Sequence, residues 1–461
     1  MLENKSQFQK RLSFLMELRT QGPAATAFTI LALQLLLPLT IFITIISIFK
    51  NISCNKKKNK KPDFKGTILL TGGKMTKALQ LARLLKRSGY KIILAEDKKY
   101  RASGHAWSNC VDSFYLLPSL SEGYFVYEKT LLRIIEEEQI DLMIPVASPV
   151  SVYVDAKFKK NIGSRLKIFH FTEDELLCLD HKYNLCAKAR ELGLASPDVH
   201  LIKSRRELEL FDFDDTKKRY VLKSLVYAPI ERLKRPLLPF DEQNEYFSSL
   251  TISPDRPWVL QEFVSGREFC THSTVHEGKI LLHCCCESSE FQLRYKHVDN
   301  KDIYNWVETF VKAMNLTGQI SFDFIVNERG EVMPIECNPR THSAITAFYN
   351  SECVADSYIK PEITQLSLLE PCFPNKEAKE TYWLYHELWE LFKCRSFGQI
   401  KNQLKLIFFG KEAILDSLDP LPFIMVYHWQ IPSLLIQALK SKASWIRIDF
   451  NIGKLVEVDG D

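Results

Sequence analysis

An uncharged run near the N-terminus constrains this chain more than any other feature. Residues 27–49 read AFTILALQLLLPLTIFITIISIF, in which Gln34 and a few hydroxyl groups are the polar side chains. A helix of about 20 apolar residues spans the hydrocarbon core of a bilayer, and a proline within it is tolerated. A signal peptide would have a shorter run followed by a cleavage site. The sequence therefore predicts a helix that crosses or enters a membrane. A helix in the membrane plane, or packed on the protein itself, stays open.

Basic residues cluster after this run. The lysines that follow it are Lys50, Lys56, Lys57, Lys58, Lys60 and Lys61, and four basic residues precede it. Because positive charge favours the cytoplasmic side, we expect the body of the chain to lie in the cytoplasm, attached to the membrane by this helix. The lysine-rich segment 55–66 is either a contact for anionic lipid or a solvated spacer.

Beyond this segment the composition is that of a globular protein. The chain has 461 residues, of which 46% are hydrophobic, enough for two or three domains. Its net charge of +5 arises in the first 65 residues, so nucleic acid is not expected as a partner of the near-neutral body. Twelve cysteines without a repeated C-x-x-C favour a reducing compartment over a disulfide framework. We expect the adjoining Cys284, Cys285 and Cys286 to fill a strand rather than bind a metal, since neighbouring strand residues face opposite sides.

Strands and helices alternate in the first part of the body. The predicted elements are strands at 66–73, 90–96 and 141–145 and helices at 77–88 and 127–139. This order predicts βαβ units and a parallel sheet. The Gly72-Gly73 turn after the first strand lacks the dinucleotide fingerprint, so NAD binding is not expected.

The second part mixes the two kinds of element differently. The predicted elements are helices at 174–194 and 303–315 and strands at 220–226, 258–264, 319–326 and 331–337. The last two strands are joined by the turn NERG and form a hairpin. The pattern predicts α+β lobes behind an α/β domain.

The hairpin SFDFIVNERGEVMPIECNPR contains the most informative side chains. Glu336 and Asn338 are two apart and face the same side of a strand, and the turn can bring Asp323 towards Glu336. Two carboxylates and an amide oxygen suit one or two Mg²⁺ ions that also bind phosphates. Arg340 follows with the same parity, where it can contact a transferring phosphate. Carboxylates embedded in apolar runs are costly when unpaired, which favours a metal site over a solvated face.

Residues earlier in the chain suit a nucleotide. Lys223 lies inside an apolar strand, where a phosphate would offset the cost of its charge; a buried salt bridge is the alternative. Lys182 stands near the start of a helix and is either phosphate-bound or exposed. In QEFVSGRE, residues 261–268, a strand end can offer backbone groups to an adenine, and Glu268 can accept from ribose hydroxyls.

These pieces in this order, with VLQEFVSGRE and FDF…IECNPR as the strongest, resemble the ATP-grasp superfamily of ligases over residues 66–350. The resemblance implies an ATP-grasp fold, α/β plus α+β, in which an N-terminal α/β domain precedes two α+β lobes that clamp ATP. It implies that the ATP-binding residues are Lys182, Lys223, Gln261, Glu262, Val264 and Glu268. It also implies that Asp323, Glu336 and Asn338 bind Mg²⁺ and that Arg340, Lys223 and Arg294 are catalytic.

The expected parts are an anchor and linker at 1–61, an α/β domain at 62–175, a central lobe at 176–264, a metal-binding lobe at 265–370 and an extension at 371–461.

The chain departs from the superfamily in its phosphate lid. The segment 224–239, SLVYAPIERLKRPLLP, has no glycine. Either its backbone amides cradle phosphate, or Arg232, Lys234 and Arg235 replace them.

The tail is similar to the C-terminal extension of the cyanobacterial ATP-grasp ligases of mycosporine biosynthesis. The similarity lies in GKEAILDSLDPLPFIMVYHWQIPSLLIQAL and WIRIDFNIGKLVEVDGD, and the N-terminal run fits the same family. It implies that glycine is joined to 4-deoxygadusol: ATP phosphorylates an enolised ring oxygen, and the amine displaces phosphate. Candidate substrate contacts are Arg294, Lys296, His297 and His342, each with a structural role as the alternative.

Other functions stay open at this point. A carboxylate–amine ligase that forms an amide through an acyl phosphate would share the hinge and metal motifs. A membrane-tethered nucleotide-binding regulator is disfavoured, because the expected metal residues and Lys223 are all present. A Rossmann-type oxidoreductase lacks its glycine signature. The sequence decides neither the amino-acid scope nor whether the chain forms a homo-oligomer.

Overall fold

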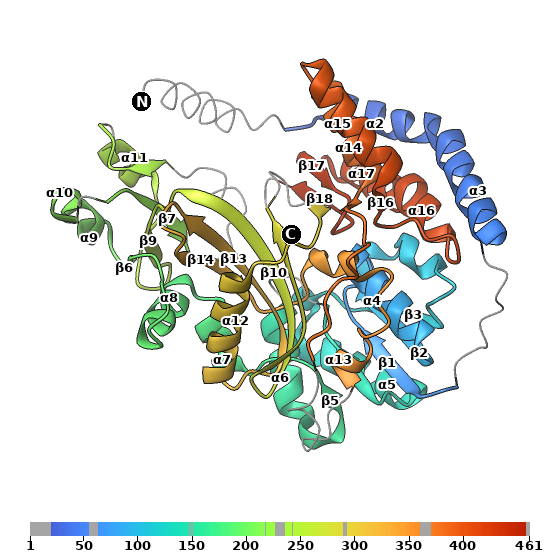
Figure 1. Cartoon of the computed structure of the whole chain (residues 1–461), viewed down its shortest axis with the longest axis horizontal. Helices are drawn as coiled ribbons and strands as arrows, with labels where there is room; N and C mark the ends of the chain where they lie inside the picture. Colours follow the sequence, from blue (N-terminus) through green and yellow to red (C-terminus); the bar gives the residue numbers. More distant parts are fainter. Residues whose placement is uncertain are drawn as a thin grey trace.

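The computed structural model describes residues 20–54, 63–146, 149, 151–216, 218–225, 236–241, 243–288, 293–359 and 370–457. Figure 1 shows a parallel sheet with its helices on one side of the molecule and two antiparallel sheets on the other. The C-terminal helices and two N-terminal helices lie together at one end. Arg232, Lys234 and Arg235 of the lid segment, and the lysines of the linker after Lys50, lie outside the described residues.

The predicted βαβ unit is confirmed and belongs to a five-stranded parallel sheet of order β3-β2-β1-β4-β5. Its elements are β1 (Gly66–Leu70), α4 (Thr76–Arg87), β2 (Tyr90–Asp97), β3 (Ser113–Leu117), α5 (Tyr124–Glu138), β4 (Leu142–Ile144), α6 (Ser151–Ile162) and β5 (Lys167–Ile168). The turn after β1 needs glycine at Gly72, where φ is +72° and a Cβ atom would lie 2.1 Å from the Val146 carbonyl oxygen. The turn therefore brings β1 and α4 close to the loop after β4.

A second sheet, of order β6-β9-β7-β8, is antiparallel. Its region contains α7 (Glu173–Leu179), α8 (Lys182–Glu191), β6 (Val199–Ile202), α9 (Arg205–Glu209), α10 (Phe213–Thr216), β7 (Tyr220–Ser224), β8 (Leu237–Leu238), α11 (Gln243–Ser249) and β9 (Trp258–Glu262). The predicted single helix at 174–194 is wrong, because two helices meet there. His181 Nδ1 accepts from the Asn184 amide at the start of α8, and Asn184 Nδ2 donates to the Leu177 carbonyl of α7. Lys182 consequently begins its own helix.

The third sheet, of order β11-β10-β13-β14, is antiparallel and contains the predicted hairpin. Its elements are β10 (Gly266–His276), β11 (Lys279–Glu287), α12 (Lys301–Ala313), β13 (Gly318–Asn327) and β14 (Val332–Asn338). Trp306 and Phe310 of α12 pack on Phe322 and Phe324 of β13. The triplet Cys284, Cys285 and Cys286 is buried in β11, as expected for thiols that fill a strand.

The C-terminal extension covers α4 and the face of the parallel sheet on which α4 packs. The elements of the extension are β15 (Thr381–Tyr382), α14 (Leu384–Lys393), α15 (Phe397–Phe409), β16 (Lys411–Glu412), α16 (Leu421–Met425), the π-helix η8 (Val426–Gln430), α17 (Ile431–Ser441), β17 (Trp445–Asp449) and β18 (Lys454–Glu457). Before the extension, the chain also forms β12 (Arg294–Tyr295), η6 (Ser343–Phe348) and α13 (Asp356–Ile359). Leu70 of β1 and Leu81 of α4 share one hydrophobic core with Trp383 and Tyr427. Polar side chains of α4 are buried as well: Arg83 contacts Asp419 of the extension, and Lys77 contacts Thr341 of the preceding lobe.

Arg83 and Asp419 form an ion pair across this interface, with Nε 2.8 Å from Oδ2 and both side chains 2% exposed. Asp419 also accepts from the Ser108 hydroxyl and the Asn109 amide. Asp419→Ala would leave a buried guanidinium without its partner, so we expect a loss of about 3–5 kcal/mol in the free energy of unfolding. Glu137→Ala, which breaks the exposed pair with Arg133, should cost less than about 1 kcal/mol. Urea unfolding followed by tryptophan fluorescence measures both, and equal effects would contradict the structural role of Asp419.

The uncharged run forms α2 (Pro23–Leu35) and α3 (Leu37–Cys54), which lie beside the C-terminal helices in Figure 1. Within the described residues, the stretch Pro23–Lys50 is the one helix long and apolar enough to cross a membrane. Its hydroxyl groups contact the extension: the Trp445 indole donates to Thr26, and Thr40 is hydrogen-bonded to Tyr385 and His428. The alternative of a helix packed on the protein is therefore realised in part, although most of the large apolar side chains of this stretch remain exposed.

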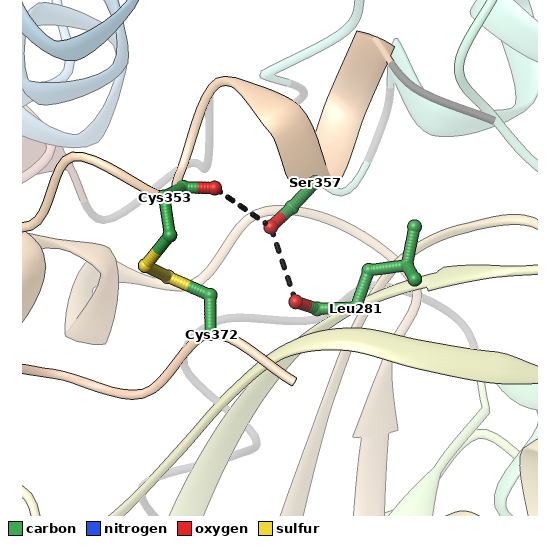
Figure 2. Close-up of a disulfide and its surroundings, with 4 residues drawn as sticks. All are labelled: Leu281, Cys353, Ser357 and Cys372. Carbon is green, nitrogen blue, oxygen red and sulfur yellow. Dashed lines mark hydrogen bonds between the residues drawn. A yellow bond between two sulfur atoms is a disulfide. The ribbon is translucent and has the colours of Figure 1, made fainter. Parts of the chain in front are cut away.

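One disulfide, Cys353–Cys372, forms among the described cysteines, a pair that the sequence analysis did not predict. Figure 2 shows it beside Ser357, whose hydroxyl donates to the carbonyl oxygens of Leu281 and Cys353. Cys372 is positioned by β11, since its amide donates to Leu281 and its carbonyl accepts from His283. The pair is joined by tertiary contacts across 19 residues of sequence, which spacing alone does not reveal. The other cysteines whose side chains are described are free thiols.

Candidate active site

Three carboxylates from three adjacent strands lie on one face of the third sheet. Asp323 of β13 is directly opposite Glu336 of β14 and opposite Cys270 of β10. Glu268 is two residues before Cys270 and so faces the same side. The predicted approach of Asp323 to Glu336 is confirmed, and Asn338 follows Glu336 with the same parity.

Asp323 is buried in an environment that disfavours its charge. The side chain is 8% exposed, and its Oδ1 has no hydrogen-bond partner among the described residues. Burial, followed by the charges of Glu336 and Glu268, raises the pKa of Asp323 to about 8, against the opposing effect of Arg340 and Lys223. A divalent cation would offset the cost of burying the charge and the repulsion from Glu336 and Glu268, so these residues fit Mg²⁺.

Asn338 completes the candidate cation site. The Arg340 guanidinium donates to Asn338 Oδ1, and the Arg340 amide donates to the Asn338 carbonyl at 2.8 Å. Among the residues that the structure describes, no group of three His, Cys, Asp or Glu side chains is arranged to hold a metal ion. A metal ion here would therefore depend on the amide oxygen of Asn338 and on oxygens of a ligand.

Two lysines from the second sheet and its helices converge on the same strand. Lys182, at the start of α8, is 5% exposed and has its Nζ 3.2 Å from Glu336 Oε1. Lys223 of β7 is 7% exposed, and its Nζ donates to the Ile335 carbonyl at 3.3 Å. Both predicted phosphate-binding lysines thus contact consecutive residues of β14, from a separate sheet that faces it.

The predicted hinge residues alternate in direction at the end of β9. Gln261 points towards β14, where its Nε2 donates to the Ile335 carbonyl at 3.4 Å, and its buried Oε1 has no partner among the described residues. Glu262 points the other way and accepts from the Asp198 amide and from Lys218. Val264 is buried. A side-chain role for Glu262 in binding adenine stays a prediction, as does a backbone role.

Glu268 lies on an exposed part of β10 near Lys223. Desolvation by neighbouring atoms raises the pKa of its carboxyl, and the charge of Lys223 opposes that shift. The Glu268 carboxylate therefore lies close enough to Lys223 to interact with its charge. Its predicted contact with ribose stays a prediction.

Arg294 is placed at the junction with the C-terminal extension. Its Nε donates to Glu387 Oε1 at 3.0 Å, and its Nη2 donates to Glu387 Oε2 at 2.6 Å and to Gln403. These partners belong to α14 and α15, which supports the structural alternative for Arg294. Of the other candidates, Lys296 is exposed, and His297 Nδ1 accepts from the Cys285 amide.

His342 and Lys77 stand beside Arg340. Desolvation and the charges of Lys77 and Arg340 lower the pKa of His342 to about 3, which keeps the imidazole neutral. Lys77 donates to the Thr341 carbonyl at 2.6 Å, and burial lowers its pKa to about 7, with smaller contributions from Arg340 and Lys74. The sequence analysis did not single out Lys77. Its place just after the first strand of a parallel sheet, where ligands commonly bind, could have indicated it.

Comparison with known proteins identifies the fold. No family model matches the sequence, and no curated protein matches it. Among solved structures, N5-carboxyaminoimidazole ribonucleotide synthetase in an ADP complex aligns with a TM-score of 0.51 and 13% identity, covering 70% of this chain and 82% of its own. An L-amino acid ligase from Bacillus licheniformis aligns with a TM-score of 0.50 and 15% identity, covering 67% and 78%. The predicted ATP-grasp fold is thereby confirmed.

Proposed function

We propose that this protein is an ATP-dependent ligase that forms a carbon–nitrogen bond after phosphorylating the acceptor. The observation that carries the proposal is the gathering of Lys182, Lys223 and Arg340 around the buried, incompletely hydrogen-bonded Asp323 and its neighbour Glu336. Adjacent carboxylates and lysines suit a metal-bound triphosphate, whose charge needs both. The ATP-grasp fold supports the same activity.

Each residue has a separate task in this proposal. Lys182 and Lys223 bind phosphate oxygens, and the Lys182–Glu336 pair orients the lysine before ATP binds. Asp323, Glu336 and Asn338 would hold Mg²⁺, which when bound neutralises phosphate charge. Arg340 contacts the transferred phosphoryl group, where its fork of donors matches three equatorial oxygens. The adenine is received at the end of β9, by Gln261, Glu262 and Val264.

For the substrates we propose glycine and 4-deoxygadusol, as in mycosporine-glycine synthase, on the similarity of the tail. An enol oxygen of the ring attacks the terminal phosphorus of ATP, forming an O–P bond as the bond to ADP breaks. The glycine amine then adds to that ring carbon and loses a proton, and the C–O bond breaks to release phosphate. The products are the enaminone, ADP and phosphate. Lys77, whose Nζ donates to the Thr341 carbonyl next to Arg340, receives the glycine carboxylate.

A carboxylate–amine ligase is the second candidate. Its acceptor would be a carboxylate that forms an acyl phosphate and then an amide, and the same residues would bind ATP. The fold similarity to an L-amino acid ligase favours it as much as the first candidate. The two candidates differ in the acceptor alone.

Product analysis of the full chain in detergent tests these proposals. The protein is incubated with ATP and Mg²⁺ and with either 4-deoxygadusol plus glycine or a set of free carboxylates plus amino acids. ADP formed only with 4-deoxygadusol and glycine, with a product mass equal to their sum minus water, supports the first candidate. ADP formed only with a carboxylate selects the second. Absence of ADP with every pair, in protein that binds ATP, would contradict the proposed ligase.

Glu268→Ala provides a separate test of the nucleotide site. Ribose contacts are similar in the ground and transition states, so we expect the KM for ATP to rise about tenfold with kcat unchanged. Glu287→Ala, which removes an exposed glutamate from the neighbouring strand β11, should change neither constant. Steady-state kinetics of ADP release measures both variants. A large fall in kcat at constant KM would rule out a ribose-binding role.

We also propose that the catalytic body lies at the cytoplasmic face of a membrane, attached through residues 27–49. The length and apolar composition of the helical stretch Pro23–Lys50 support this attachment. Phase separation in a detergent such as Triton X-114 is the direct test, since an attached protein enters the detergent phase.

A further inference from the structure

The hairpin of α14 and α15 exposes aromatic side chains that soluble proteins normally bury. Trp389 is 62% exposed, Phe392 85%, Phe397 82%, Phe408 75% and Phe409 68%. They lie on two consecutive helices of the C-terminal extension. Five exposed aromatic side chains on two packed helices indicate a surface that contacts another apolar phase.

This hairpin adjoins the apolar N-terminal helices. The Thr40 hydroxyl of α3 is 2.8 Å from the Tyr385 hydroxyl of α14, and Gln34 of α2 donates to the His428 carbonyl at 3.0 Å. Figure 1 shows α2, α3, α14 and α15 at the same end of the molecule. The two exposed apolar areas therefore lie on adjoining elements.

The N-terminal helices bury polar side chains and expose apolar ones, which is the reverse of surface helices in a soluble protein. Their buried polar residues, Thr26, Thr40 and Thr44, face inward. Large apolar side chains face outward: Phe28 is 71% exposed, Phe42 60% and Phe49 65%. A soluble protein would present its polar face to water. The outward apolar face fits a bilayer, as in helices that lie in the membrane interface.

The charge around the hairpin suits anionic lipid. Lys393, Arg395, Lys401 and Lys405 are exposed on or between α14 and α15. Of the two glutamates in the hairpin, Glu387 is buried against Arg294, and Glu390 pairs with Lys393 at 2.7 Å. The exposed charge is thus basic. Basic residues interleaved with aromatic ones are typical of segments that bind the headgroup region.

We propose that α2–α3 and the α14–α15 hairpin form one docking surface that rests on an anionic bilayer, with α2–α3 in the plane of the interface. The contacts of Thr26, Thr40 and Gln34 with the extension hold the N-terminal helices against the body. A helix that crossed the bilayer would have to give up these contacts. Arg294 has a positioning role in this surface, because its bonds to Glu387 and Gln403 join both hairpin helices to β12.

Tryptophan quenching tests whether the hairpin touches lipid. The full chain is bound to vesicles of phosphatidylcholine and phosphatidylglycerol whose acyl chains are brominated near the headgroup. We expect strong quenching, a large part of which disappears in Trp389→Phe. Phe125→Trp adds an exposed probe on α5, at the other end of the molecule in Figure 1, and its added emission should not be quenched. If the emission of Trp389 is the same in free and in vesicle-bound protein, the proposal is overturned.

Vesicle flotation tests whether the hairpin contributes to binding. Phe392→Ser combined with Phe408→Ser should weaken binding at least about tenfold, because two large apolar side chains leave the bilayer. Phe125→Ser removes an equally exposed phenylalanine, 73% exposed, and should leave binding unchanged. Vesicles of phosphatidylcholine alone should bind more weakly than those with phosphatidylglycerol. Unchanged binding of the double variant, with loss of a dimer in sedimentation velocity, would instead identify a contact between copies of this chain and overturn the lipid proposal.

These outcomes are independent of the proposed ligase. All the substituted side chains are exposed, so melting temperatures and ADP formation in detergent should match those of the unmodified protein. If neither the variants nor the unmodified protein form ADP, that result counts against the proposed ligase activity and not against the lipid-binding surface.

Discussion

Asp323→Asn is expected to abolish ADP formation while making the protein more stable. Asp323 is buried, faces two other carboxylates and has an oxygen without a hydrogen-bond partner among the described residues. Asparagine has the same shape without the charge, so it removes the repulsion but also a proposed Mg²⁺ ligand. We expect kcat to fall by at least about a thousandfold, the scale seen when a group that stabilises transition-state charge is removed. A gain in stability with a loss of activity is the pattern of a residue kept for function.

The stability gain should depend on pH. The pKa of Asp323 is about 8 in the folded protein, against an ordinary value of 3.8. The folded state therefore binds this proton more tightly than the unfolded chain does. The protonated carboxyl contributes stability below about pH 4, and that contribution is lost as the pH rises through about 8. The melting temperatures of the variant and the unmodified protein should differ little at about pH 4 and most above about pH 8.

Ligand-induced shifts separate the two effects. Mg²⁺ with ATP should raise the melting temperature of the unmodified protein, since binding stabilises the folded state, and should raise that of Asp323→Asn much less. Asp255→Asn, at an exposed position, serves as the matched control and should change neither activity nor the shift. An Asp323→Asn variant that forms ADP at the unmodified rate would exclude Asp323 as a metal ligand.

The elements that could be predicted from sequence are those that local patterns determine. The glycines around β1 and α4 and the NERG turn between β13 and β14 indicate where strands begin and end. Strand parity together with that turn was enough to predict that Asp323 approaches Glu336. Strand parity could not predict that Lys182 and Lys223 lie beside β14. Their contacts join α8 and β7 to a strand of another sheet, and only the resemblance placed them at the same site.

Features that depend on long-range packing could not be predicted. Arg83 of α4 is buried because the C-terminal extension covers it with Asp419, and Lys77 is buried beside Thr341 of the metal-binding lobe. The partner of Arg294 is Glu387, which is 93 residues away and on a helix that the sequence analysis did not assign. The break between α7 and α8 depends on capping by His181, a residue seldom read as a cap. Periodicity carries no information on such contacts.

Lys223→Met is expected to weaken ATP binding and slow turnover together. The lysine contacts the Ile335 carbonyl beside Glu336, and its charge lowers the pKa of both Asp323 and Glu268. Methionine keeps the aliphatic stem but cannot attract phosphate. We expect the Kd for ATP to rise at least about tenfold and kcat to fall by about a hundredfold to a thousandfold. Calorimetric titration with ATP and Mg²⁺ and assays of ADP release measure the two quantities. Lys203→Met, which removes an exposed lysine just after β6 of the same sheet, should leave both unchanged.

A buried salt bridge would predict a different result for the same variant. If Lys223 only neutralised the carboxylates, Lys223→Met would lower stability, because the repulsion at Asp323 would grow, and the Kd for ATP would not change. Combining it with Asp323→Asn would then restore stability, and the double variant would bind ATP no more weakly than Asp323→Asn alone. The phosphate role predicts instead that the double variant regains stability but binds ATP more weakly than Asp323→Asn alone, since removing a carboxylate does not replace the lost ammonium group. The double variant therefore distinguishes a lysine that serves the fold from one that serves the nucleotide.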